Sequence, residues 1–285
     1  MRRTLWNTTG SALAAILVMG LSACSDSTNP SGGALISAPE ANDIGEAVAD
    51  EVDQSVGALT VEDVAATPPG TSCATVSGSS DTDGDGAPDL ATYTFALPAC
   101  SWTGFRGGTL EITGSVDISD PTPSVFDFAY QATLHDLQFK FTGPQGDLSF
   151  TAVRNGTRVL TGNASGIALS NNITVDRTFP VRQPASVSHN LLLTFTPAQG
   201  ESVALGQPLP DGTFEKSGTL TWSRGSTTRT FAVTTVEPLV WDASCTTDRK
   251  IASGEIHATL GGGGYIKTVW NGCGQDPVRT FVPAS

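Results

Sequence analysis

The sequence predicts an all-β protein: an antiparallel up-and-down meander, closed into a barrel or folded as a sandwich, with a short N-terminal helix. From residue 71 onward, Thr, Val, Phe and Leu alternate with polar residues in short runs, which Gly, Asn, Asp and Pro separate. No second long helical pattern interrupts these runs, which argues against a parallel βαβ sheet. The length suits one such β domain, which we place at residues 71–285.

A narrow amphipathic pattern before the β-rich region predicts a helix over residues 39–60. Its apolar residues recur at steps of three and four, namely Ile44, Val48, Val52, Val56 and Leu59. Pro39 suits the first helical turn, and Pro68-Pro69-Gly70 prevents a helix from continuing further. We expect this helix to cover the domain's own sheet rather than to bind a partner.

The alternating runs also predict where the strands lie and how they pair. The candidate strands are residues 71–78, 90–98, 108–118, 124–134, 137–143, 147–153, 157–162, 166–175, 186–196, 212–223, 228–236, 239–245, 251–260 and 264–271. A tight turn at His135-Asp136 would place Leu134 opposite Leu137 on one apolar face. A turn around Ser226-Thr227 would place Trp222 opposite Phe231. A turn in the glycine run 261–264 would place Ile256 opposite Trp270, and successive hairpins of this kind form a meander.

The first residues have the pattern of an export signal. Arg2 and Arg3 precede an apolar stretch from Ala12 to Leu21 that is too short to span a bilayer. The stretch ends in Leu21-Ser22-Ala23-Cys24, which resembles the lipobox of bacterial lipoproteins. This resemblance implies that residues 1–23 are a signal peptide and that the mature chain begins at a lipid-bearing Cys24, through which it is anchored to the membrane. The alternative is an ordinary secretory signal with an incidental cysteine.

Residues 24–38 have the composition of a flexible tether. They are rich in Ser, Gly, Asn and Pro, and a lipid-anchored domain needs such a segment to stand off the membrane. By analogy with the sorting of proteobacterial lipoproteins, Ser25 rather than Asp after the cysteine favours the outer membrane. We therefore expect a protein of the cell envelope that faces either the periplasm or the cell surface.

The chain is strongly acidic. Without the two arginines of the predicted signal it keeps 13 basic and 28 acidic residues, a net charge of −15. Nucleic acids and anionic lipid headgroups both require basic patches on the proteins that bind them. The charge therefore argues against nucleic acid as a partner, and the identity of a protein or ligand partner is left open.

Four cysteines remain once Cys24 is assigned to the lipid. An even number of cysteines in an exported protein indicates disulfides, and the close Cys pairs of zinc sites are absent from the sequence. Of the three possible pairings we predict Cys73–Cys100, because both fall at the open end of the hairpin expected around residues 81–89. We also predict Cys245–Cys273, because Cys273 follows strand 264–271 and so comes close to Cys245.

One motif carries ligand chemistry. The segment Asp81-Thr82-Asp83-Gly84-Asp85-Gly86-Ala87-Pro88-Asp89 resembles the calcium loops of thrombospondin type 3 repeats and the first half of an EF-hand loop. Calcium prefers six to eight oxygen ligands. We predict a structural Ca²⁺ held by the carboxylates of Asp81, Asp83 and Asp85 and by the Ala87 carbonyl, with Asp89 bound directly or through water. Thr92 departs from the EF-hand pattern, which has a bidentate Glu at this position. The alternative interpretation of the segment is a solvated acidic turn that binds no metal ion.

The sequence lacks the usual catalytic signatures, and we predict that the protein is not an enzyme. Its three histidines, His135, His189 and His257, belong to separate predicted hairpins. The tryptophans Trp102, Trp222, Trp241 and Trp270 are expected in the core rather than in a sugar site. The leading hypothesis is a noncatalytic envelope module that binds, scaffolds or protects. The alternatives are a carrier or sensor with an apolar ligand inside a curved sheet and, less favoured, a hydrolase that uses scattered carboxylates.

Overall fold

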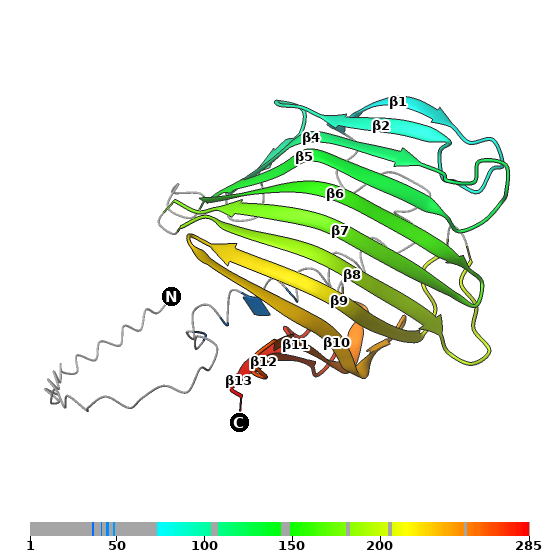
Figure 1. The fold of residues 1–285 in the computed structure, drawn as a ribbon. Helices are drawn as coiled ribbons and strands as arrows, with labels where there is room; N and C mark the ends of the chain where they lie inside the picture. The colour runs from blue at the N-terminus through cyan, green and yellow to red at the C-terminus, as the bar shows by residue number, and fades with distance from the viewer. Residues whose placement is uncertain are drawn as a thin grey trace, which may run out of the picture. The chain divides into compact units, whose positions relative to one another are not determined.

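The computed structural model describes residues 73–103, 108–143, 149–180, 183–204, 207–247 and 250–284, together with Ile36, Ala41, Ile44, Gly45 and Val48 (Figure 1). The predicted signal peptide and Cys24 lie outside the described residues. The tether over residues 24–38 also lies outside them except for Ile36, which is buried in the core. Most of the predicted helix over residues 39–60 lies outside them too. Within the part of the chain that the structure describes, no helix is long and apolar enough to cross a membrane.

The described chain beyond residue 73 forms thirteen strands in one sheet. The strands are β1 (Thr75–Ser80), β2 (Leu90–Phe95), β3 (Ser101–Thr103), β4 (Thr109–Ser119), β5 (Tyr130–Thr142), β6 (Ser149–Asn163), β7 (Gly166–Thr178), β8 (Ala185–Pro197), β9 (Gly212–Arg224), β10 (Thr227–Trp241), β11 (Ile251–Leu260), β12 (Tyr265–Trp270) and β13 (Val278–Val282). They confirm the predicted all-β class.

The sheet is an antiparallel meander, as the sequence predicts. Each strand from β4 to β13 pairs with its neighbours in the chain, and β1 pairs with β2. Short β3 pairs with the first half of β4, and β2 pairs with the second half, so the two share one edge of β4. The sheet is not closed into a barrel, because β1 and β13 stand at its two ends. Figure 1 shows that it curves strongly between β9 and β12.

The predicted hairpin at His135-Asp136 is wrong, because β5 runs through both residues without turning back. Asp136 has a φ of 46°, and the pairing registers of β5 with both β4 and β6 shift at this point. Asn155 on β6 holds this bulge: its Oδ1 accepts from the Asp136 amide at 2.8 Å, and its Nδ2 donates to the Asp136 carboxylate at 3.0 Å. A β-bulge bends a strand and leaves it in the sheet.

Two glycines allow the neighbouring strands to follow this bend. Gly114 on β4 has a φ of 109°, and a Cβ there would collide with the Asp136 carbonyl oxygen. Gly156 on β6 has a φ of 132°, and a Cβ there would collide with the Asn172 carbonyl oxygen. Only glycine adopts such angles readily. The same glycine joins the predicted strands 147–153 and 157–162 into the single strand β6.

The other two predicted hairpins form, each with its register displaced by two residues. Leu220 on β9 lies opposite Phe231 on β10, and Ile256 on β11 lies opposite Thr268 on β12. Because side chains alternate with a period of two, this displacement leaves the same residues on the buried face. Strand β10 also unites the predicted strands 228–236 and 239–245 through a register shift between Thr234 and Leu239.

One face of the sheet carries the core. On β8, for example, the buried residues are the alternate positions Ala185, Val187, His189, Leu191, Leu193 and Phe195. Trp222, Trp241 and Trp270 are at most 4% exposed, and Trp102 packs partly buried against the same cluster, as expected. The opposite face carries hydroxyl pairs such as Thr221–Thr230 at 3.1 Å and Ser223–Thr228 at 3.0 Å.

The described residues before β1 belong to this core as well. Ala41, Ile44, Gly45 and Val48 are helical in conformation and buried, at the spacing of one helix face. Gly45 lies against the sheet, since a Cβ there would be 3.3 Å from Ile266 Cγ2 on β12. These four residues agree with the expected covering of the sheet, while the helix over residues 39–60 as a whole stays a prediction.

Both predicted disulfides are present. Cys73, just before β1, is bonded to Cys100, just before β3, with their Cα atoms 5.1 Å apart. Cys245, after β10, is bonded to Cys273, after β12, with their Cα atoms 6.1 Å apart. Each bond joins chain ends that the antiparallel pairing has already brought together, and Cys100 is fully buried in the core.

Candidate calcium site

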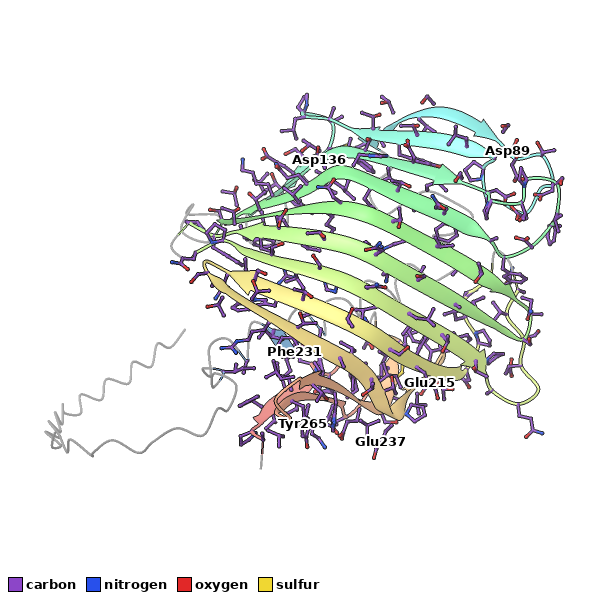
Figure 2. The ribbon with its side chains drawn as sticks, viewed as in Figure 1. Asp89, Asp136, Glu215, Phe231, Glu237 and Tyr265 are labelled. Carbon is purple, nitrogen blue, oxygen red and sulfur yellow. A yellow bond between two sulfur atoms is a disulfide. The ribbon has the colours of Figure 1, made fainter. Side chains whose placement is uncertain are left out.

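The Asp-rich segment forms the connection between β1 and β2. The predicted hairpin forms around this segment, with Thr75 opposite Thr94 and Ser80 opposite Leu90. The Asp89 amide donates to the Ser80 carbonyl at 2.6 Å and closes the loop. Figure 2 labels Asp89 at one end of the long strands, far along the sheet from the bulge at Asp136.

Three of the predicted ligands come together in this loop. One carboxylate oxygen from each of Asp81, Asp83 and Asp85 lies within 4.8 Å of the other two. The Asp81 carboxylate accepts from the amides of Gly84 at 2.8 Å and Gly86 at 3.0 Å, which folds the loop around it. Both glycines have a positive φ, 78° and 96°, so the sharp bend depends on them.

Two of these carboxylates have a buried oxygen that no protein group satisfies. Asp85 is 6% exposed; its Oδ1 accepts from the Ala87 amide at 2.7 Å, and its Oδ2 is buried without a hydrogen-bond partner. The Oδ2 atom of Asp83 is also buried without a hydrogen-bond partner. A buried carboxylate oxygen without a partner is destabilising, and a bound cation removes this cost.

The pKa of Asp85 reflects the same environment. Burial of the carboxyl group raises its pKa, and the nearby charges of Asp83 and Asp120 raise it further. The Ala87 amide, which donates to this carboxylate, and the nearby backbone of Asp127 act in the opposite direction. The site therefore favours a positive charge beside Asp85, which either a proton or a metal ion can supply.

The Asp89 carboxylate does not belong to the group of three and is engaged with Thr82. Both oxygens of Asp89 accept from Thr82, from the amide at 3.0 Å and from the hydroxyl at 2.7 Å, and these bonds lower the pKa of Asp89. Thr92 lies on β2, where its hydroxyl donates to Asp117 at 2.7 Å. The ligand roles of Ala87 and Asp89 stay predictions, and Thr92 is directed to a different carboxylate.

Sequence reasoning missed two acidic residues beside this loop, Asp120 and Asp127, both in the connection between β4 and β5. Asp120 follows the last residue of β4, and its amide donates to the Pro88 carbonyl at 2.8 Å. The signal that could have found it is the pairing of β2 with β4, in which Ala91 lies opposite Ile118. Continued by two residues, that register brings Asp120 next to Asp89.

A second group with the right residue types is not a metal site. Ligand atoms of Asp242, Cys245 and Cys273 lie close together, but the two sulfur atoms are bonded to each other. A disulfide has no thiolate to bind a metal ion. The Asp242 carboxylate is engaged with Ser244, and this bonding lowers the pKa of Asp242.

The three histidines have separate surroundings. His189 is buried on the inner face of β8, whereas His135 is exposed on β5 and lies 2.9 Å from the Asp117 carboxylate. His257 stacks on Tyr265 with ring centroids 4.2 Å apart, and its Nε2 lies 2.5 Å from the carboxylate of Glu255. The same carboxylate pairs with Lys267 on β12 at 2.5 Å. Glu255 on β11 lies opposite Glu237 on β10, which is labelled in Figure 2.

We expect the Glu255→Gln variant to melt about 2–4 °C below the wild type at pH 7. The hydrogen bond from Lys267, followed by that of His257, lowers the pKa of Glu255 in the folded protein. Its stabilisation is therefore complete above its ordinary pKa of 4.5 and is lost as the pH falls through the lowered value. Thermal unfolding at pH 7 and pH 3 measures this, and a difference that stays constant between the two would contradict it.

No protein-family model, curated protein or solved structure matches this chain.

Proposed function

We propose that this chain is a lipid-anchored lipoprotein of the bacterial envelope whose β domain is a noncatalytic binding or structural module with a calcium-stabilised connection. The lipobox-like segment ending at Cys24 supports the anchor, and Ser25 supports the outer membrane. The two disulfides indicate an oxidising compartment outside the cytoplasm. The acidic loop between β1 and β2 supports the calcium ion.

One observation carries the calcium part of the proposal: three carboxylates lie within 4.8 Å of one another, and two of them have a buried oxygen without a partner. A solvated acidic turn would direct its carboxylates outward, where water satisfies them. Calcium suits this arrangement better than a transition metal does, because every ligand is a hard oxygen. The ion would relieve the mutual repulsion of the carboxylates and hold the β1–β2 connection in one conformation.

We expect the mature chain to bind one Ca²⁺ with a dissociation constant on the order of 10⁻⁵ to 10⁻³ M, as extracellular modules do. Titration calorimetry with calcium chloride measures this, and millimolar calcium should also raise the melting temperature. The Asp83→Ala and Asp85→Ala variants should lose both effects. Neither heat nor a shift in melting temperature for the wild type would mean that the loop is only a turn.

We expect the Cys24→Ser variant to lose its membrane attachment. The lipid would be bonded to the thiol of Cys24, and serine cannot take its place. Fractionation of cells that produce each form tests this, with the soluble and membrane fractions probed for the protein. A variant that stays in the membrane fraction to the same extent as the wild type would refute the lipoprotein assignment.

The alternative function, a carrier or sensor for an apolar ligand, is favoured by the curvature of the sheet and its apolar inner face (Figure 1). Against it stand Ile36, Ala41, Ile44 and Val48, which belong to the same buried cluster as the sheet. We propose that residues 39–60 form a helix along this face, so that protein side chains and not a ligand fill it. The substitution of Leu193 discussed below distinguishes a filled core from a cavity.

A further inference from the structure

Asp120 is held against the acidic loop although it lies in a different connection. It directly follows β4, and its backbone amide donates to the carbonyl of Pro88 at 2.8 Å. This bond ties the β4–β5 connection to the β1–β2 connection, and the backbone of Asp127, further along the β4–β5 connection, lowers the pKa of Asp85.

The carboxylate of Asp120 has the same unsatisfied character as that of Asp85. Asp120 is 5% exposed. Its Oδ1 accepts from the Thr122 amide at 2.7 Å and from the Thr122 hydroxyl at 3.3 Å, whereas its Oδ2 is buried without a hydrogen-bond partner. The charge of Asp120 raises the pKa of Asp85, so the two carboxylates repel each other. A cation beside both would remove this repulsion, which burial strengthens.

We propose that the calcium site spans both connections, with Asp120 supplying the carboxylate that the first loop lacks. An EF-hand loop is closed by a bidentate glutamate at its twelfth position. Here that position is Thr92, whose hydroxyl is bonded to Asp117 on β4. Asp120, which lies outside the group of three whose ligand atoms are within 4.8 Å of one another, would turn its carboxylate to the ion from the neighbouring connection instead. The ion is then bound by Asp81, Asp83, Asp85 and Asp120. This inference rests on the calcium binding proposed above.

Binding of the ion should also reduce local opening of the β4–β5 connection. This connection includes Val125 and Phe126, whose side chains are 53% and 64% exposed. A calcium ion bound to Asp120 ties this connection to the β1–β2 hairpin. Calcium should therefore slow amide hydrogen exchange in residues 120–129 as well as in residues 81–89, because an ion that binds only the folded form reduces local opening.

The test compares two substitutions in one connection, Asp120→Asn and Asp127→Asn, by calcium titration of the mature chain. Each removes one negative charge beside the site. Both oxygens of Asp127 already accept hydrogen bonds, from Thr122 Oγ1 at 2.7 Å and from the Ala129 amide at 2.7 Å. We expect Asp120→Asn to weaken calcium binding by about tenfold or more, and Asp127→Asn to weaken it by less than about threefold. Equal losses in the two variants would overturn the assignment of Asp120.

Melting in the presence of a calcium chelator separates a ligand from a structural residue. Without the ion, Asp120→Asn removes a repulsion with Asp85 and keeps an oxygen for Thr122, so it should melt no lower than the wild type. A markedly lower melting temperature would show that Asp120 acts in folding, and would overturn the inference. If the wild type binds calcium and Asp120→Asn binds it equally well, only this inference fails. If the wild type binds no calcium, the proposed calcium function fails with it.

Discussion

We expect joint replacement of Cys73 and Cys100 by serine to lower the free energy of unfolding by about 3–4 kcal/mol, one of the two largest effects foreseen for this chain. The bond closes a loop of sequence separation 27, and its loss restores that loop's conformational freedom to the unfolded chain. Cys100 is fully buried, so the serine hydroxyl there adds a desolvation cost. Denaturant unfolding of the oxidised wild type and the double variant measures the difference.

The second disulfide provides a matched comparison for the first. Cys245–Cys273 has a sequence separation of 28, almost the same loop, but both of its cysteines are only partly buried. If loop closure is the main contribution, both double variants lose similar stability, and the Cys73/Cys100 pair loses somewhat more because of burial. Unchanged unfolding of either double variant would contradict the loop-closure argument. Reduction of the wild type by a thiol reagent gives the same comparison without any substitution.

The expected dependence of stability on the two disulfides also limits the compartments in which the protein can fold. A domain that needs both of them folds poorly in a reducing cytoplasm, which agrees with a chain made for export. The Cys73–Cys100 pairing was predictable because it follows from the register of one hairpin. The Asp-rich turn fixes how β1 pairs with β2, and Cys73 and Cys100 then fall at the open end of that hairpin.

The strand boundaries were less predictable where a contact distant in the sequence overrides a local signal. His135-Asp136 sits between two apolar runs and has the sequence of a two-residue turn, yet Asn155, 19 residues further on, bonds to both the backbone and the side chain of Asp136. Because of that contact, the positive φ of Asp136 produces a bulge within β5 and not a turn between two strands. Gly156 permits a similar continuation of β6. Local rules cannot detect either arrangement, because both depend on which strand lies alongside.

The residues of the candidate site also fall into a group that the sequence predicts and one that it does not. Asp81, Asp83 and Asp85 were predictable because all of them lie in one short loop, where spacing alone brings carboxylates together. Asp120 was not predictable from spacing, since it approaches the loop only through the pairing of β2 with β4. Extended by two residues, the register of β2 with β4 places Asp120 opposite Asp89.

The core prediction with the largest expected effect uses two adjacent leucines on β8. Leu193 is 1% exposed on the inner face, between Leu169 on β7 and Lys216 on β9, whereas Leu192 is 41% exposed on the outer face. We expect Leu193→Ala to lower the free energy of unfolding by about 2–5 kcal/mol, the range for leucines truncated in a filled core. Leu192→Ala, the same chemical change one residue away, should cost no more than about 1 kcal/mol.

This pair of substitutions distinguishes the two functional hypotheses because a truncation costs most where packed atoms surround the side chain. If side chains fill the inner face, Leu193→Ala leaves a cavity and loses both transfer free energy and packing contacts. If the inner face lines a space for an apolar ligand, the ligand-free protein has few contacts there to lose, and the cost falls toward that of Leu192→Ala. Denaturant unfolding of both variants measures the difference. A cost for Leu193→Ala below about 1.5 kcal/mol would favour the carrier over the structural module.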